Sequence, residues 1–130
     1  MKESANQRHL ANNGRIASYN SGKLRIYSGS VPADAAASIG AAVVMAEHTF
    51  AATAFTDTNG VATAAAISDV NIGTGGAASF ARAWDSAGTT CLSQHLVATS
   101  GAEVTVPTVT YVSGVASHIT SFTITQPDGT

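Results

Sequence analysis

Short stretches that alternate between apolar and polar residues, separated by glycine-bearing turns, recur along most of this 130-residue chain. The turns come at intervals of about eight to twelve residues. Alternation with a period of two places successive side chains on opposite faces of an extended strand. The pattern predicts an all-β fold, an antiparallel β-sandwich or jelly roll built from many short strands.

The alternation and the turn residues also assign individual strands. Residues 41–50 could form a buried strand or a helix segment, and the short run with its β-branched pair favours a strand. We expect residues 115–125 to form the longest strand. Strands are predicted over residues 23–27, 41–50, 61–64, 78–84, 89–98, 103–106, 109–112 and 115–125.

The connections between these strands carry their own signals. Asn59-Gly60 is a strong turn dipeptide, and residues 85–88 predict a hairpin whose glycine needs a positive φ. Residues 33–38 follow a proline and predict one helical turn. Residues 51–59 are interpreted as a polar loop, and Pro107 as the end of a strand.

Positive charge is concentrated at the start of the chain. Five of the six lysines and arginines fall in the first 25 residues, and two of these five belong to the first strand. We predict an N-terminal arm over residues 1–22, helical or extended, and a β-sandwich domain over residues 23–130. Lys2, Arg8 and Arg15 are then the arm cations that could meet an acidic partner surface.

The remainder of the chain carries little charge and few large side chains. Charged residues make up 11% of the sequence, against about 25% in an ordinary soluble domain. Much of the apolar content is alanine, which buries little area at about 25 cal/mol per Å². We therefore expect a thin core, and a homo-oligomer or another partner whose contacts supply additional burial.

The charge and hydropathy pattern argues against two classes of partner. A net charge of -2 disfavours nucleic-acid binding, which needs a cationic stripe to displace counterions from phosphates. No stretch approaches the roughly 18 apolar residues of a membrane span, and the first residues lack the apolar segment of a signal peptide. We expect neither nucleic acid nor a membrane as a partner.

The histidines and the cysteine do not form a local metal-binding pattern. His9, His48, His95 and His118 are separated by 39, 47 and 23 residues. Zinc motifs usually contain ligands only a few residues apart. Cys91 is the single cysteine and cannot form an intrachain disulfide. No metal and no other cofactor is predicted.

A nucleophilic enzyme also finds no sequence support. There is no Gly-x-Ser-x-Gly elbow, and the serines cluster in turns, where they cap backbone groups. Cys91 and His95 would share a strand face, but about 13 Å apart at roughly 3.3 Å per residue. Glycine-rich residues 73–76 lack the lysine of a phosphate-binding loop.

Carboxylate pairs for glycosidic cleavage are conceivable but poorly supported. Asp57 and Asp85 lie in turn contexts, where an aspartate usually bonds its own backbone. Sugar clefts also need several aromatic side chains, and this chain has few. The candidate carboxylates are Glu47, Asp57, Asp69, Asp85 and Glu103. We expect the protein not to be an enzyme.

Phe80, Arg82 and Trp84 share one face of their predicted strand. Facing outward, they would form a contact patch, because tryptophan and arginine are enriched at interface hot spots. Facing inward, the two rings would pack in the core with the alkyl part of Arg82 between them. Which face is buried decides between these interpretations.

Four blocks of this sequence resemble, in the same order, a family of small virion proteins of tailed bacteriophages. The first is Leu-Arg-Ile-Tyr within residues 23–29, followed by Val-Pro-Ala; the others span residues 82–90, 99–103 and 121–125. The resemblance covers roughly residues 23–125. Ala83 departs from it by replacing a larger aliphatic residue, and Val-Thr-Val-Pro at 104–107 replaces a more polar stretch.

The resemblance implies a non-enzymatic structural protein of the virion, assembled in the host cytoplasm. A capsid decoration or cement protein is the expected role, with the major capsid protein or other virion proteins as partners. The family has no catalytic residues to carry over. The residues predicted to form the interface are Lys2, Arg8, Arg15, Tyr27, Arg82 and Trp84.

Two alternative functions remain on the same fold. A tail, neck or head-tail connector accessory protein would use the same features. A host-glycan-binding adsorption module would need an exposed aromatic platform, for which Trp84, Tyr27 and Tyr111 are the candidates.

Overall fold

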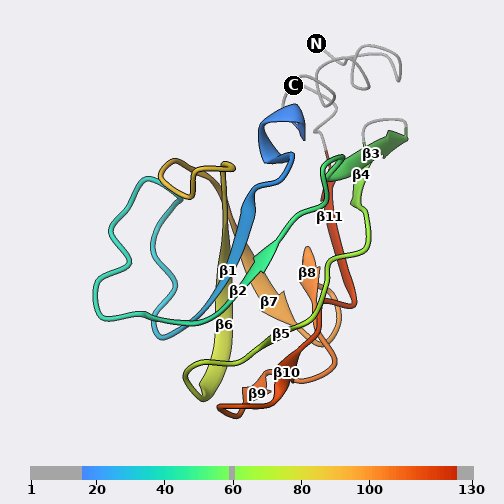
Figure 1. The fold of residues 1–130 in the computed structure, drawn as a ribbon. Helices are drawn as coiled ribbons and strands as arrows, with labels where there is room; N and C mark the ends of the chain where they lie inside the picture. The colour runs from blue at the N-terminus through green and yellow to red at the C-terminus, as the bar shows by residue number, and fades with distance from the viewer. Residues whose placement is uncertain (1–15, 59–60, 126–130) are drawn as a thin grey trace.

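The structure, a computed structural model, describes residues 16–58 and 61–125. These residues form a short 3₁₀ helix, η1 (Ala17–Tyr19), and eleven β-strands (Figure 1). The strands are β1 (Lys23–Ser28), β2 (Val43–Thr49), β3 (Phe55–Thr58), β4 (Val61–Ala64), β5 (Val70–Asn71), β6 (Gly76–Trp84), β7 (Cys91–Ala98), β8 (Val104–Thr105), β9 (Thr110–Tyr111), β10 (Ala116–Ser117) and β11 (Ser121–Thr125). No helix among the described residues is long and apolar enough to cross a membrane.

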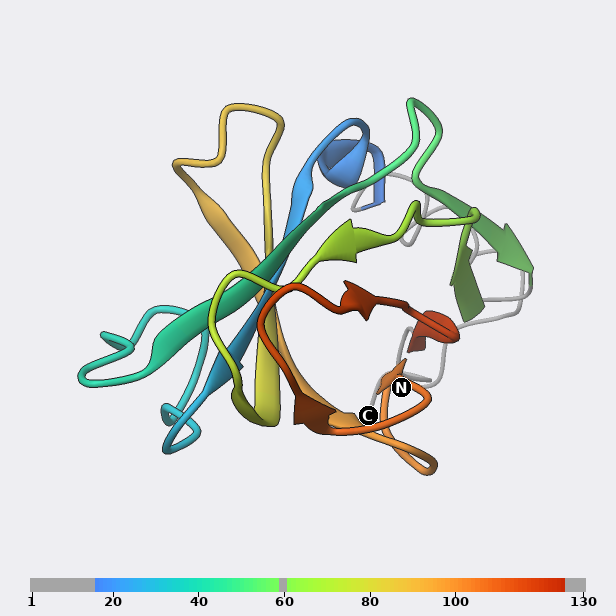
Figure 2. The same ribbon diagram turned by 60° about the horizontal axis from the view of Figure 1, so that its bottom comes forward.

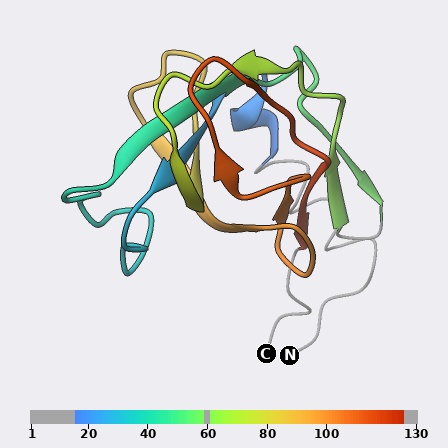
Figure 3. The same cartoon turned by 90° about the horizontal axis from the view of Figure 1, so that it is seen from below.

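Most strands belong to one strongly curled sheet. Its strands follow the order β2-β1-β6-β7-β8-β11-β4-β3, and β9 pairs with the start of β6. Neighbouring strands run antiparallel except β7 and β8, which are parallel. The sheet curls into a half-barrel (Figure 3). The prediction of an all-β, sandwich-like fold is confirmed.

A second, two-stranded sheet lies beside the first. It consists of β5 and β10, which run next to each other in Figure 2. The N–H of Gly73, just after β5, donates to the carbonyl of Met45 in β2 at 2.9 Å. This small sheet therefore lies against one end strand of the curled sheet, where it partly satisfies the open backbone edge.

Four aromatic rings hold the two ends of the curled sheet together. Tyr19, Phe50, Phe55 and Phe122 are each at most 4% exposed, and the contacting rings have centroids 5.2 to 6.1 Å apart. Phe50 follows β2 and Phe55 begins β3, the two strands at opposite ends of the sheet order. We call these four residues the ring cluster. Their contacts close the sheet on itself.

Small side chains occupy much of the remaining inner face. Ala81 and Ala83 of β6 are fully buried and lie opposite Ile26 and Leu24 of β1. An alanine removes little apolar area from water, whereas an aromatic ring removes much more. The ring cluster therefore supplies a large share of the burial in this core.

The opposite, outer face of β1 and β6 is also covered. Tyr27 and Phe80 stack with centroids 4.8 Å apart and planes within 3° of parallel. Arg82 shares this face and is itself buried. Neither interpretation made for Phe80, Arg82 and Trp84 fits alone, because they point away from the ring cluster and yet Phe80 and Arg82 are buried.

The segment of residues 29–42 is fastened to this outer face by Arg82 and Gln94. Arg82 donates from Nε to the Gln94 side chain at 3.0 Å, and from Nη2 to the carbonyls of Asp34 and Ala37 at 3.1 and 2.6 Å. Gln94 in turn donates to the carbonyl of Pro32 at 2.8 Å. A charged donor bonded to several carbonyls forms a strong anchor for a segment without regular structure.

Local turn chemistry was predicted well in one place and less well in another. The hairpin over residues 85–88 is confirmed, and Gly88 has φ of 71°. The helical turn expected over residues 33–38 is instead a turn capped by Asp34. Its carboxylate accepts the N–H groups of Ala36 and Ala37, both at 2.9 Å.

Two predicted elements are wrong. Residues 51–59, interpreted as a loop, contain strand β3, which pairs with β4 and brings Phe55 into the ring cluster. Residues 115–125, expected to be one long strand, form β10 and β11, which pair with different partners. The chain breaks around Ile119, whose side chain is buried in the core.

The packing places the start of the β-body earlier than residue 23. Ile16 and Tyr19 are 5% and 2% exposed and belong to the core. The side chain of Asn20 accepts the N–H of Ala54 at 3.0 Å. Residues 16–22, assigned above to the arm, therefore pack as part of the body, and the rest of the predicted arm lies outside the described residues.

We expect Arg82→Met to release the segment of residues 29–42 while leaving the curled sheet folded. Each hydrogen bond from a charged donor contributes about 1.5–3 kcal/mol, so thermolysin cleavage within the segment should accelerate roughly tenfold or more. Arg25→Met is the matched control, since Arg25 lies on the same face and bonds Glu47 instead. Equal cleavage rates in both variants would contradict the anchoring role.

Candidate functional site

The predicted interface residues lie in three different settings. Lys2, Arg8 and Arg15 lie outside the described residues. Tyr27 and Arg82 are buried on the outer face, so neither side chain can reach a partner surface in this structure. Trp84 is half-buried.

Trp84 lies beneath a neighbouring arginine. The guanidinium of Arg25 is 4.7 Å from the centre of the indole ring, and its Nε donates to Glu47 at 2.6 Å. The cation–π contact and the ion pair together hold Arg25 flat against the sheet. Trp84 therefore presents only part of its surface.

The inner face of the half-barrel holds two hydrogen-bonded chains with the same order of groups. Each runs from a tyrosine hydroxyl to a serine hydroxyl and then to an imidazole. The first polar chain is Tyr19, Ser93, His95 and Glu103. The second polar chain is Tyr111, Ser117, His48 and the carbonyl of Ser68.

Short contacts link the members of the first polar chain. The Tyr19 hydroxyl donates to Ser93 Oγ at 2.7 Å, Ser93 Oγ lies 2.6 Å from His95 Nε2, and His95 Nδ1 lies 2.6 Å from Glu103 Oε1. Because an ionised carboxylate only accepts, Nδ1 carries a proton, and in the neutral ring Nε2 accepts from Ser93. With this neutral ring, the protons of the chain all point toward Glu103.

The serine, histidine and carboxylate of this chain stand in the order used by nucleophilic hydrolases. Two features distinguish it from such a site. The oxygen that would attack, Ser93 Oγ, already accepts the proton of Tyr19. The ring of His95 packs edge-on against Phe122 of the ring cluster, with centroids 4.7 Å apart. We interpret the first polar chain as a network that fixes β7 against β8 and η1, buried at Tyr19 and His95 and exposed at Glu103.

The second polar chain is more deeply buried. His48 is fully buried; its Nδ1 lies 3.0 Å from the Ser68 carbonyl and its Nε2 lies 2.8 Å from Ser117 Oγ. A carbonyl only accepts, so Nδ1 holds the proton. Burial lowers the pKa of His48 below its ordinary 6.5, so the ring is neutral near neutral pH and Nε2 accepts from Ser117.

The direction of these bonds determines what the tyrosine at the end of the second polar chain can do. Tyr111 Oη lies 3.2 Å from Ser117 Oγ. Since Ser117 gives its proton to His48, the Tyr111 hydroxyl donates to Ser117 and keeps its own lone pairs as acceptors. Burial also raises the pKa of Tyr111, so the phenol stays protonated near neutral pH.

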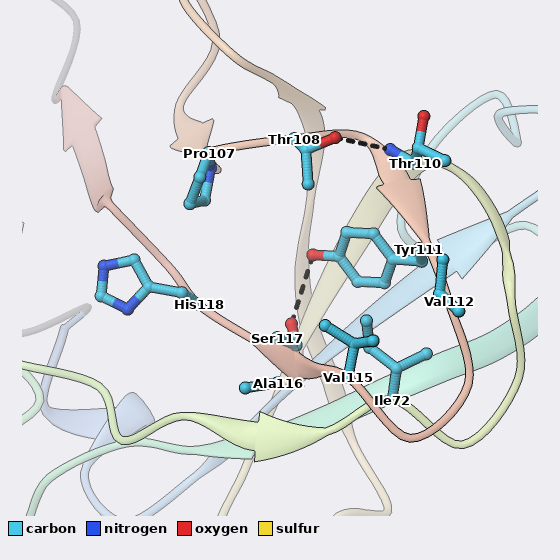
Figure 4. Close-up of a pocket in the computed structure, with 10 residues that line it drawn as sticks. All are labelled: Ile72, Pro107, Thr108, Thr110, Tyr111, Val112, Val115, Ala116, Ser117 and His118. Atoms are coloured by element: carbon cyan, nitrogen blue, oxygen red, sulfur yellow. Dashed lines mark hydrogen bonds between the residues drawn. The ribbon is translucent and has the colours of Figure 1, made fainter.

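A pocket of about 170 Å³ opens beside Tyr111. Its wall comes mainly from the segment of residues 107–118, which contains β9 and β10 (Figure 4). The hydroxyl of Tyr111 points toward the middle of the ring of lining residues. The lining includes Ile72, Pro107, Tyr111, Val112, Val115 and Ser117. The lining is mainly apolar, and its polar members besides Tyr111 are Thr108, Thr110, Ser117 and His118.

The remaining histidine and the cysteine have separate surroundings. His118 lies on the surface with its Nδ1 2.7 Å from Asp69 Oδ1. Cys91 is half-buried, and burial raises the pKa of its thiol, which disfavours the reactive thiolate. Within residues 16–58 and 61–125, no three histidine, cysteine or carboxylate side chains gather as metal ligands. His9 lies outside these residues.

The carboxylates considered for glycosidic cleavage mostly have structural partners. Asp85 accepts the N–H groups of Thr89 and Thr90 at 3.1 and 3.3 Å, which lowers its pKa and confirms its turn role. Asp57 is not in a turn but in β3, where it is buried. The other three bond a basic side chain: Glu47 bonds Arg25, Asp69 bonds His118 and Glu103 bonds His95.

Sequence reasoning missed both polar chains. Ser93 and His95 are two residues apart in one strand, and the period-two rule places them on one face. Their partners come from distant segments, 74 residues away for Tyr19 and 69 residues from His48 to Ser117. Only the fold brings these groups together.

Comparisons with family models, with curated proteins and with solved structures found no match to this chain. The geometry nevertheless defines what the region offers. It contains two polar chains whose groups bond one another, and a mainly apolar pocket into which the Tyr111 hydroxyl points. A mainly apolar pocket with a few polar groups is a common form of small binding site.

We expect His48→Asn to reduce the loss of unfolding free energy that occurs as the pH falls below neutrality. As pH falls through 6.5, the unfolded chain protonates His48 while the folded chain resists, so the free energy of unfolding declines until the lowered folded-state pKa is reached. Stability from this group is fully present above 6.5. Urea unfolding between pH 8 and 5 measures the slope.

His118→Asn is the matched control for this experiment, because it removes an exposed histidine with its own carboxylate partner. The control should keep the slope that His48 contributes. If His48→Asn leaves the difference in unfolding free energy between pH 7.5 and pH 5.5 unchanged, the buried neutral imidazole is not a determinant of acid stability.

Proposed function

We propose that this chain is a non-enzymatic structural protein of a tailed-bacteriophage virion, and specifically a capsid decoration or cement protein. Such a protein acts by mass action: it binds only the assembled lattice and thereby stabilises it, and many weak sites add through multivalency. The observation that carries the proposal is that the four sequence blocks of the resemblance fall on two pairs of contacting elements.

The first two blocks meet on the outer face of the sheet. The block within residues 23–29 forms β1, and the block at residues 82–90 forms the end of β6 and the following hairpin. Arg25 from the first block covers Trp84 from the second and donates to the carbonyl of Gly88 at 3.4 Å. The first two blocks therefore form one of the contacts between strands in this fold.

The last two blocks meet in the same way. The block at residues 99–103 leads into β8, and the block at residues 121–125 forms β11. The N–H of Thr123 donates to the carbonyl of Glu103 at 3.1 Å, and His95 contacts both Glu103 and Phe122. Blocks that join strands are what a shared structural framework requires, whereas a shared enzyme would need blocks that meet at reacting groups.

The surface also favours a binding role. Several large apolar side chains are between 38% and 58% exposed, in a chain with few charges. Apolar side chains left exposed on a weakly charged surface are available for contact with another protein. These side chains are Val31, Val43, Val44, Val61, Leu96, Val112 and Val115.

These observations leave the tail or neck alternative open and disfavour the glycan-binding alternative. A tail, neck or connector protein would use the same surface and remains an outcome of the test. A glycan-binding module would need a platform of exposed rings, yet Tyr27 and Tyr111 are buried and Trp84 is half-buried. The decoration role therefore has more support than the glycan-binding role.

We expect this protein to be abundant in purified particles of a phage that encodes it. A decoration protein should approach the copy number of the major capsid protein, as measured by quantitative mass spectrometry of the particles. A copy number that is a small fraction of that value would favour the tail or neck role, and absence from the particles would contradict the proposal.

The same particles test the arm. Deletion of residues 1–15 keeps Ile16 and Tyr19 in the core and should reduce occupancy strongly. Joint replacement of Lys2, Arg8 and Arg15 by glutamine should reduce it in a salt-sensitive way. Lys23→Gln on β1 is the control and should leave occupancy unchanged. Full occupancy after the deletion would show that the arm is not needed for binding to the particle.

A further inference from the structure

We propose that the pocket beside Tyr111 is a socket for a phenolic side chain, a tyrosine presented by a partner protein. The inference goes beyond the virion role, because it rests only on the size of the pocket, the direction of the bonds in the second polar chain and the exposure of the rim. Each of these three observations restricts the occupant in a different way.

The volume and lining select a single aromatic ring. The pocket measures about 170 Å³ and is walled largely by Ile72, Pro107, Val112 and Val115. An apolar cavity of about 150 Å³ is known to hold benzene and to remain free of water. A six-membered ring therefore fits this volume, and a bicyclic indole is a poor match.

The second polar chain selects a ring that carries a hydrogen-bond donor. The protonated Nδ1 of His48 is held by the Ser68 carbonyl, so Ser117 donates to His48 and Tyr111 donates to Ser117. The Tyr111 oxygen is left with lone pairs only, and in Figure 4 it points into the pocket. A phenol can satisfy this acceptor, whereas the unsubstituted ring of phenylalanine cannot.

The exposed valines at the rim of the pocket favour a ring that belongs to a protein over a free small molecule. Val112 and Val115 line the pocket and are also 55% and 53% exposed. A free phenol that filled the pocket would leave most of this apolar surface in water. A tyrosine on a partner chain would bury it with its neighbouring residues, as aromatic anchors do at interface hot spots.

Side-chain analogues test the ring and the donor separately. In the full chain, methyl NMR signals of Val112 and Val115 should shift saturably with p-cresol, the tyrosine analogue, and with toluene, the phenylalanine analogue. We expect p-cresol to bind roughly threefold to tenfold more tightly, the effect of one neutral hydrogen bond. Indole should bind more weakly than either.

Tyr111→Phe is the decisive variant. It keeps the apolar wall and removes the acceptor, so the preference for p-cresol should disappear while the affinity for toluene stays the same. No saturable shift at these valines, or a preference for p-cresol that survives in Tyr111→Phe, would overturn the proposal. Its outcome is independent of whether the protein is found in virions.

Peptides distinguish a protein partner from a free phenol. A blocked Ala-Tyr-Ala peptide should bind more tightly than p-cresol, because its flanking residues reach the rim. Val115→Asp should weaken the peptide more than p-cresol, whereas Leu96→Asp, at an exposed apolar position outside the pocket, should affect neither. A peptide that binds no better than p-cresol would overturn the assignment to a partner protein.

Discussion

Closure of the curled sheet by the ring cluster is the contact on which the rest of this structure depends. The chain has only eight aromatic side chains of the Phe, Tyr and Trp types, and four of them meet where the two end strands approach each other. The same rings position the first polar chain, because Tyr19 supplies its first hydroxyl and Phe122 supports His95. With alanines on much of the inner face, no other group of side chains could supply comparable burial.

In this arrangement the potentially reactive side chains bond one another inside the fold, and apolar side chains remain exposed to solvent. Two serines and two histidines that could in principle react are engaged with one another in the two polar chains. The solvent-exposed surface carries several apolar side chains and includes the pocket beside Tyr111. Exposed apolar side chains and a pocket are features that the proposed structural role and the proposed socket for an aromatic side chain both require.

The sequence correctly predicted features that depend on neighbouring residues. It did not predict features that depend on contacts between distant segments. The period-two pattern identified β1, and the Asp85 to Gly88 hairpin followed from local turn chemistry. The break near Ile119 arises because β10 and β11 pair with different strands, which no local pattern records. The first polar chain needs β7 and β8 to run parallel, so the meeting of His95 and Glu103 could not be foreseen.

Native-state hydrogen exchange in Phe55→Ala tests the closure most directly, with Phe80→Ala on the outer face as the matched control. If the ring cluster closes the sheet, loss of the Phe55 ring should lower the protection of β2 amides together with those of β3 and β4, because both ends of the sheet open as one unit. In the Phe80→Ala control, the amides of β2 should not lose protection together with those of β3 and β4. Loss of protection confined to β3 and β4, with β2 unchanged, would contradict the account.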